Sequence, residues 1–100
     1  MHYVYLLQHE LSGDLYIGTT DDPKRRLGQH NAKGKKFSTR PDGKWEYIYL
    51  EIYRSKNDAL SREKKLKAHA NGKQQLLKRL RNSLLSPKLV RDQKVNTKYE

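Results

Sequence analysis

Two short apolar runs near the start of the chain predict a β-hairpin. The stretches HYVYLL at residues 2–7 and LYIG at residues 15–18 are rich in tyrosine and aliphatic side chains, as is typical of strands. The turn residues Ser12 and Gly13 lie between the two runs. Because side chains alternate along a strand, an even-length loop would place Tyr5 and Tyr16 on the same face of the hairpin.

A third strand is predicted at residues 45–53, where WEYIYLEIY alternates strictly. This alternation places Ile48, Leu50 and Ile52 on one face of the strand. The other face carries Tyr47, Tyr49, Glu51 and Tyr53.

A helix is expected between the second and third strands. Asp21 or Asp22 can cap its amino end, with Pro23 as the first residue, where the missing N–H costs nothing. Gly34 is the expected end of this helix. Residues 33–44 lack periodicity and contain glycine, proline and aspartate, which predicts a basic loop.

Two further helices are expected in the second half of the chain. Ser55 or Asn57 can cap the first of them, whose apolar stripe runs up to Asn71-Gly72. A leucine-rich pattern predicts the next helix over about residues 73–85. The polar segment 86–100 is expected to be a loosely held, flexible tail.

Glu63 interrupts the apolar stripe of the first of these two helices. It lies three residues from both Leu60 and Leu66, so helical spacing directs its carboxylate inward, where an unpaired charge is costly. Glu63 therefore has a function at the interior, turns out to solvent, or pairs with Lys67 one turn further on.

Length and composition narrow the class of protein. One hundred residues suffice for a single domain with a modest core, which we expect at residues 1–85. The absence of cysteine excludes disulfides, thiolate zinc sites and a cysteine nucleophile. With no apolar run of about 18 residues and no signal-peptide core, we expect a cytoplasmic protein outside the membrane.

The charge of the chain favours a polyanionic partner. Its net charge is +11, from 22 Lys and Arg against 11 Asp and Glu, and nucleic acid is the natural partner of such a small domain. A basic surface that is merely solvated is the alternative. Residues 22–45 favour nucleic acid, since they hold Lys24, Arg25, Arg26, Lys33, Lys35, Lys36, Arg40 and Lys44 against Asp22 and Asp42.

Five sequence elements occur in an order and spacing that resemble the GIY-YIG nuclease family. They are the motifs Tyr3-Val4-Tyr5 and Tyr16-Ile17-Gly18, then Arg26, His30 and Glu63. With YVYLL, LYIG, RRLGQHN and ALSREKKLK, the chain is similar to small stand-alone members of that family over residues 2 to about 70. Two features depart from the family pattern: the first motif lacks its glycine, and Thr19 stands where some members have lysine. The resemblance implies an α/β fold of the α+β type, a small three-stranded antiparallel sheet flanked by helices.

The same resemblance implies that Tyr5, Tyr16, Arg26, His30 and Glu63 are catalytic. The tyrosines would act as general base or would position the attacking water, although an ordinary phenol loses its proton only near pH ~10. His30 would be a base or a phosphate ligand, since an ordinary imidazole titrates near ~6.5. Arg26 would clamp phosphate oxygens, and Glu63 would hold one Mg²⁺ or Mn²⁺ whose remaining ligands are water and DNA. Without the resemblance, each tyrosine would be assigned to the core or to an interface, and Arg26 to the surface.

Other basic residues are expected to bind the nucleic acid without taking part in the chemistry. Phe37 is available to stack on a base, and a solvated loop is the alternative. We assign no role to the aromatic residues of the third strand. The expected phosphate contacts are Lys24, Arg25, Lys35, Lys36 and Arg40.

The sequence thus favours a metal-dependent endonuclease that hydrolyses phosphodiester bonds in DNA. We expect a structure-selective or non-specific enzyme, because about 30 residues after position 70 are too few for a second DNA-binding domain. A monomer is the default. The alternatives are a catalytically inert nucleic-acid-binding module of the same fold and a basic protein that binds RNA or ribosomes.

Overall fold

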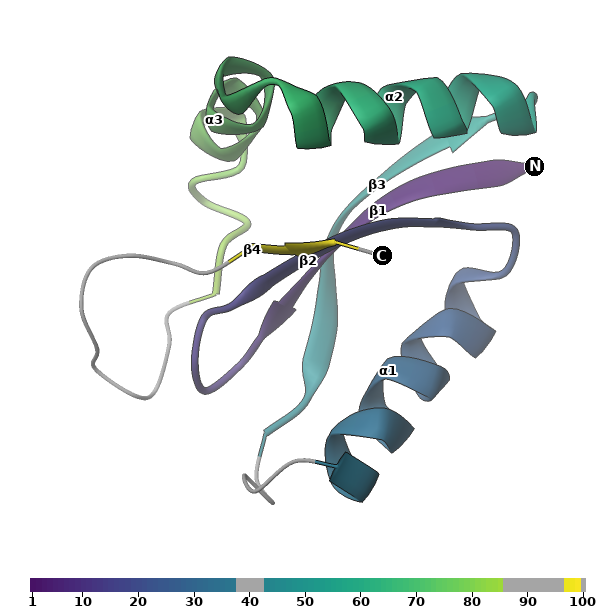
Figure 1. Ribbon diagram of the computed structural model, residues 1–100. Helices are drawn as coiled ribbons and strands as arrows, with labels where there is room; N and C mark the ends of the chain where they lie inside the picture. Colours follow the sequence, from purple (N-terminus) through teal and green to yellow (C-terminus); the bar gives the residue numbers. More distant parts are fainter. Residues whose placement is uncertain (38–42, 86–96, 100) are drawn as a thin grey trace.

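A sheet with the strand order β3-β1-β2-β4 forms the centre of the molecule (Figure 1). The computed structural model describes residues 1–37, 43–85 and 97–99, and the account below concerns these residues. Three strands are antiparallel neighbours, and the short strand β4 joins the sheet in parallel beside β2. The strands are β1 (His2–His9), β2 (Leu15–Thr20), β3 (Trp45–Tyr53) and β4 (Thr97–Tyr99).

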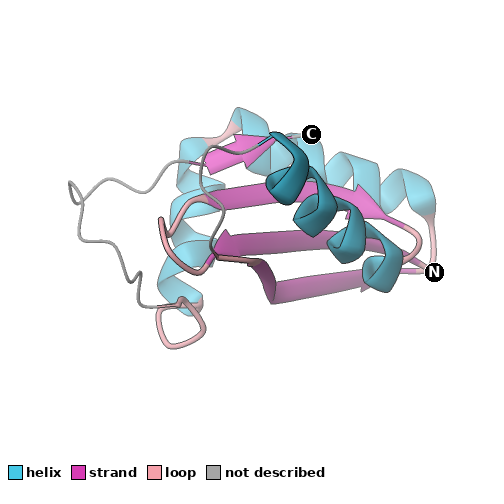
Figure 2. Cartoon of the chain, turned by 90° about the horizontal axis from the view of Figure 1, so that it is seen from below, coloured by secondary structure: helices cyan, strands magenta, loops and turns pink. Residues whose placement is uncertain are grey.

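Helices cover both faces of this sheet. Helix α1 (Pro23–Phe37) lies across one face, while α2 (Lys56–Ala68) and α3 (Ala70–Arg79) lie on the other, as the two views in Figures 1 and 2 show. The antiparallel arrangement of β3, β1 and β2 between helices confirms the predicted α+β fold.

The β1–β2 hairpin has the loop length that places the two motif tyrosines together. The backbone N–H of His9 donates to the carbonyl of Asp14 at 2.9 Å, which leaves a four-residue loop over residues 10–13. Gly13 has φ of 78° in this loop, a conformation that favours glycine. Tyr5 pairs with Gly18, two residues from Tyr16, so both tyrosines face the same side of the sheet, as an even-length loop predicts.

Helix α1 begins where the sequence predicts and continues further. Pro23 is its first residue, and the Asp22 carboxylate accepts a hydrogen bond from the backbone N–H of Arg25 at 3.1 Å. The predicted end at Gly34 is wrong, because the helix extends to Phe37. The predicted basic loop therefore begins later than residue 33, and residues 38–42 lie outside the described part of the chain.

The strict alternation predicted for β3 is interrupted by a bulge. Leu6 of β1 pairs with Tyr49 whereas Leu7 pairs with Tyr47, so Ile48 is the extra residue between them. Tyr47 consequently faces α1, on the side of Tyr5, while Tyr49 faces the opposite side with α2. The predicted polar face is thus divided between the two sides of the sheet.

The start of α2 agrees with the prediction, but both ends of α3 differ from it. Ser55, one of the two predicted caps, caps α2, since its Oγ accepts from the backbone N–H of Asp58 at 3.4 Å. Helix α3 ends at Arg79, before the predicted residue 85. The predicted break at Asn71-Gly72 is wrong, because the chain turns at His69, whose backbone is extended. Residues 97–99 form β4 where a flexible tail was expected, and residues 86–96 and 100 lie outside the description.

The hydrophobic core lies between the sheet and the α2–α3 layer. Strands β1 and β2 contribute aliphatic side chains that are almost fully buried, and the two helices cover them. Burial of this apolar surface is the main force that holds the α2–α3 layer against the sheet. The members of this core are Val4, Leu6, Leu15, Ile17, Ala59, Leu66, Leu76 and Leu80.

A polar cluster around Glu51 fastens α2 to the edge strand β3. The Glu51 carboxylate accepts hydrogen bonds from the hydroxyls of Tyr49 and Tyr53, each at 2.7 Å, and from Arg62 Nε at 3.0 and 3.1 Å. Burial opposes the charge, but the bonds from Arg62, Tyr49 and Tyr53 together lower the pKa of Glu51. Burial and the neighbouring carboxylate raise the pKa of Tyr49 to about 12.

The substitution Glu51→Gln is expected to lower the free energy of unfolding by about 2 kcal/mol, because it leaves the half-buried Arg62 guanidinium without its counter-charge. Since the pKa of Glu51 is lowered, its contribution is present above the ordinary carboxyl pKa of 4.5 and is lost as the pH falls through the lowered pKa. Urea denaturation at pH 7 and pH 3 measures both effects. Glu46→Gln, an exposed change on the same strand, is the matched control, and equal losses in the two variants would contradict the account.

Candidate active site

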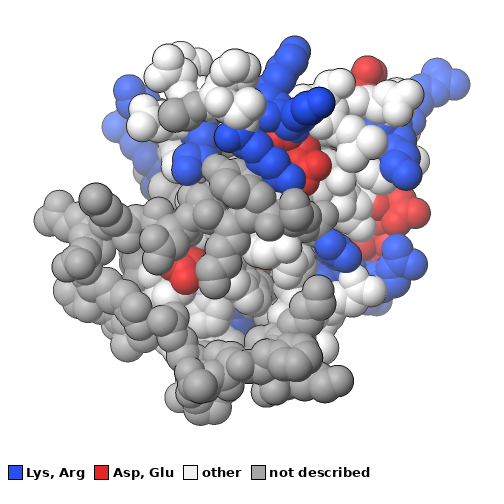
Figure 3. All heavy atoms as spheres, in the orientation of Figure 1, with Lys and Arg blue, Asp and Glu red and all other residues white. Residues whose placement is uncertain are grey.

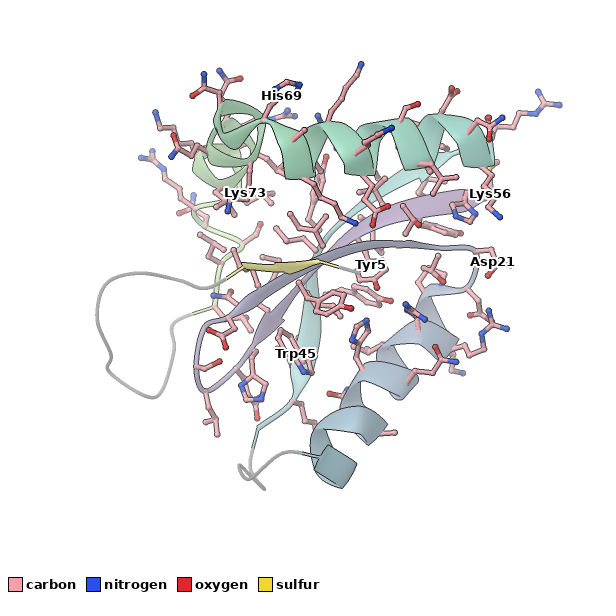
Figure 4. All side chains as sticks on the ribbon, viewed as in Figure 1. Tyr5, Asp21, Trp45, Lys56, His69 and Lys73 are labelled. Carbon is pink, nitrogen blue, oxygen red and sulfur yellow. The ribbon has the colours of Figure 1, made fainter. Side chains whose placement is uncertain are left out.

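Four of the five predicted catalytic side chains meet between the sheet and α1. Tyr5 comes from β1, Tyr16 from β2, and Arg26 and His30 lie one turn apart on α1. Figure 4 shows the Tyr5 side chain on the α1 side of the sheet, with Trp45 on the same side. Residues distant in sequence are thus brought together where the helix crosses the hairpin.

The phenolic oxygen of Tyr5 is the centre of this cluster. It lies 3.0 Å from Nε2 of His30, and it accepts a hydrogen bond from Nε of Arg26 at 3.3 Å. Tyr5 is fully buried and His30 is 7% exposed. Both side chains are therefore held in fixed positions, and the Arg26 charge is held against them.

The rings of Tyr16 and His30 contact each other edge to face. Their centroids lie 4.4 Å apart with an interplanar angle of 67°. The Tyr5 ring contacts the same imidazole, with centroids 5.9 Å apart. Tyr16 and Arg26 are only half-buried, so the cluster reaches the surface through these two side chains.

Two residues without an assigned role fix α1 in this position. Asn31 Oδ1 accepts from the backbone N–H of Trp45 at 2.8 Å, and the Tyr47 hydroxyl donates to the carbonyl of Pro23 at 2.6 Å. The Tyr47 ring also contacts Tyr5, with centroids 5.6 Å apart. Two features of the sequence could have pointed to these residues. Asn31 lies within the motif RRLGQHN, and Tyr47 lies in the third strand, where the bulge concealed which side of the sheet it faces.

Glu63, the fifth predicted residue, lies on α2 and not in the α1 cluster. Its side chain is directed inward, as helical spacing predicts, and the residue is 8% exposed. Its Oε2 lies 3.2 Å from Nζ of Lys67, so the ion pair left open as an alternative is present. Because α2 and α1 cover opposite faces, Glu63 and Arg26 can approach one substrate only around an edge of the sheet (Figure 1).

Glu63 is the residue that fits a divalent cation by its chemistry. Mg²⁺ and Mn²⁺ prefer oxygen ligands, and in phosphate-processing sites one carboxylate often serves together with water and substrate. The described residues contain no group of three or more His, Cys, Asp or Glu that could hold a metal ion.

The predicted phosphate contacts lie along α1. Lys24 and Arg25 are exposed in its first turns, where Arg25 pairs with Asp21 at 3.2 Å. Lys35 and Lys36 belong to the last turns of the helix, and their side chains lie outside the description, as does that of Phe37. Arg40 falls in the part of the chain that the structure does not describe.

Comparison with known proteins shows the family to which the chain belongs. The model of the GIY-YIG catalytic domain matches residues 1–78, and the chain therefore belongs to the GIY-YIG family of nucleases. Proteins similar to this chain include UPF0213 proteins. The one from Haloquadratum walsbyi is 36% identical over 77 residues, which covers 76% of this chain and 84% of that protein. The one from Pseudomonas aeruginosa is 42% identical over 66 residues, which covers 65% of this chain and 62% of that protein.

One solved structure is also similar. It is the solution NMR structure of a UPF0213 protein from Bacillus halodurans, 32% identical, with 77% of this chain and 82% of that chain covered and a TM-score of 0.47.

Within the described residues, no helix has the length and apolar character needed to span a membrane.

Proposed function

We propose that this domain is a metal-dependent endonuclease that hydrolyses phosphodiester bonds in DNA, with low selectivity for sequence. The observation that carries the proposal is the contact of one buried phenolic oxygen with both Nε2 of His30 and Nε of Arg26. A half-buried cation held against a buried hydroxyl and a buried imidazole suits the cleavage of a phosphate ester.

Arg26 is proposed to bind the non-bridging oxygens of the scissile phosphate. Its guanidinium remains charged at any working pH, and its planar shape matches two oxygens of a phosphate. Its bond to Tyr5 holds it in place before substrate arrives, so little reorganisation is needed as negative charge develops.

Tyr5 and His30 are proposed to receive a proton from the attacking water, together with Tyr16. Since Arg26 donates to the Tyr5 oxygen, the phenolic proton can pass to His30 when Nε2 of the imidazole is unprotonated. The imidazole then holds the proton that leaves the phenol, and the phenolate can accept the proton of the water. Tyr16 is proposed to orient the water, since it contacts His30 and reaches the surface.

Glu63 is proposed to hold the single divalent ion, Mg²⁺ or Mn²⁺. When bound, such an ion neutralises negative charge on the phosphate and on the departing oxygen. We propose that the scissile phosphate lies beside β2, because this strand carries Tyr16 of the α1 cluster. Strand β2 also packs against α2, which carries Glu63.

The proposal is tested by incubating the purified chain with supercoiled plasmid, single strands and branched DNA in Mg²⁺ or Mn²⁺. Metal-dependent cleavage at many sequences is the expected result. Binding to all three substrates without cleavage would instead indicate the inert binding module, and cleavage confined to one short sequence would contradict the low selectivity.

Reversal of Lys35 and Lys36 to glutamate is expected to weaken binding to every DNA sequence. Two lost phosphate contacts should reduce the slope of log affinity against log salt by about two. Cleavage at saturating DNA should change much less, which makes the rate at saturation an internal control. An affinity at low salt equal to that of the wild type would show that the end of α1 lies outside the binding surface.

A further inference from the structure

A second concentration of positive charge lies in the α2–α3 layer, opposite the α1 cluster. Residues 64–85 contain seven Lys and Arg and no Asp or Glu, whereas residues 1–37 contain six Lys and Arg against four Asp and Glu. Lys and Arg gather over α2 and α3 in the space-filling view (Figure 3). The seven are Lys64, Lys65, Lys67, Lys73, Lys78, Arg79 and Arg81.

Most of these seven cations have no counter-charge among the described residues. Lys67 forms an ion pair with Glu63. Five of the seven are exposed, and none of these five has a carboxylate within ion-pair distance in the part of the chain that the structure describes. They are Lys64, Lys65, Lys78, Arg79 and Arg81. Unpaired positive charge of this density attracts polyanions.

The outer side of α3 also has a shape that can hold part of a ligand. An open hollow on the surface is lined, among the described residues, by Gln74, Leu77, Lys78 and Arg81. Gln74, Leu77 and Lys78 lie in one stripe of α3, and Arg81 lies in the turn directly after the helix ends at Arg79. Leu76 and Leu80 are buried in the core. The hollow thus combines two cations and an amide with one apolar side chain, which suits the phosphates and sugars of a nucleic acid backbone.

We propose that the outer face of α3 is a second binding surface for the nucleic acid backbone, with Lys78 and Arg81 as its phosphate contacts. The proposal rests on the proposed function for its choice of partner, because the α1 cluster is suited to a phosphodiester. Since α3 and α1 lie on opposite faces of the sheet, the phosphates bound at α3 belong to a different part of the nucleic acid from the bond that is cleaved (Figure 1).

The test measures binding of a fluorescent DNA duplex in EDTA, where no metal-dependent cleavage takes place. The double variant Lys78→Glu/Arg81→Glu is expected to bind roughly tenfold more weakly than the wild type, and the salt slope should fall by about two. Lys78→Gln/Arg81→Gln, which removes charge without reversal, should give a smaller loss in the same direction.

The matched control is Arg54→Glu/Lys56→Glu. These exposed residues lie at the amino end of α2, away from α3 (Figure 4), and their reversal changes the net charge by the same amount. Equal affinities in the control and the Lys78/Arg81 variant would overturn the proposal, as would a wild-type protein that does not bind duplex at low salt. If the Lys78/Arg81 variant loses binding while the wild-type protein never cleaves DNA, the α3 surface is supported and the nuclease proposal is refuted. Failure of the surface proposal can therefore be distinguished from failure of the nuclease proposal.

Discussion

The substitution Glu63→Gln is expected to reduce metal-dependent nicking of plasmid DNA by about two orders of magnitude or more, with the fold intact. Glutamine keeps the size and helix propensity of the side chain but removes the negative charge that we assign to the metal. DNA affinity should be equal or slightly higher, because one carboxylate has left the path of the phosphate. Nicking rates at saturating DNA in Mg²⁺ and in Mn²⁺ measure the effect.

The ion pair with Lys67 supplies the control for this prediction. Lys67→Gln breaks the same ion pair but leaves the carboxylate in place. If Glu63 acts through the metal, this variant should retain most of the nicking activity that Glu63→Gln loses. Equal losses in the two variants, with equal losses of thermal stability, would instead mean that the ion pair only supports α2. Wild-type nicking by Glu63→Gln would show that Glu63 holds no catalytic metal.

The substitution Arg26→Ala is expected to reduce nicking by a factor of roughly 10² to 10³ and to weaken DNA binding as well. It removes the cation proposed for the phosphate and also the bond that Nε donates to Tyr5. Single-turnover nicking and duplex binding in EDTA separate the two effects. A loss of binding together with activity distinguishes a phosphate clamp from a metal ligand such as Glu63.

Arg25 is the matched control for Arg26. It is the adjacent cation on α1, it is exposed, and it pairs with Asp21 and not with the tyrosine cluster. Arg25→Ala should weaken binding modestly and leave the rate at saturating DNA close to that of the wild type. Similar rates for the two variants at saturation would mean that α1 contributes only general positive charge.

Local sequence signals predicted the parts of the fold that local interactions determine. The hairpin follows from the turn residues at Ser12 and Gly13, and the start of α1 follows from Asp22 and Pro23. The shared face of Tyr5 and Tyr16 depends only on the parity of the loop. These features require no knowledge of distant parts of the chain.

The structure differs from the sequence prediction where tertiary contacts override local conformational preference. Gly34 is tolerated inside α1, since a single glycine costs only about 1 kcal/mol there. The bulge at Ile48 is a property of the β1–β3 pairing, and the sequence of one strand does not reveal it. Strand β4 likewise exists through its pairing with β2, in a polar segment whose composition predicts a tail.

In the candidate site, too, local spacing was predicted correctly and tertiary contacts were not. Helical spacing predicted that Arg26 and His30 share a face and that Glu63 points inward. The contacts of Tyr47 with Tyr5 and Pro23 could not be predicted, because they depend on the bulge that turns Tyr47 toward α1. Pairing of Glu63 with Lys67 was one of three open possibilities that spacing alone did not separate.

The most direct test of the proposed nuclease is the nicking of supercoiled plasmid by the purified chain, with Mg²⁺ or Mn²⁺ in one arm and EDTA in the other. The account predicts open-circular product in the metal-containing arm, with little or none in EDTA or with Arg26→Ala protein. Nicking that persists equally in EDTA, or in the Arg26→Ala protein at the wild-type rate, would contradict it. So would a correctly folded protein that binds the plasmid and leaves it supercoiled in both metals.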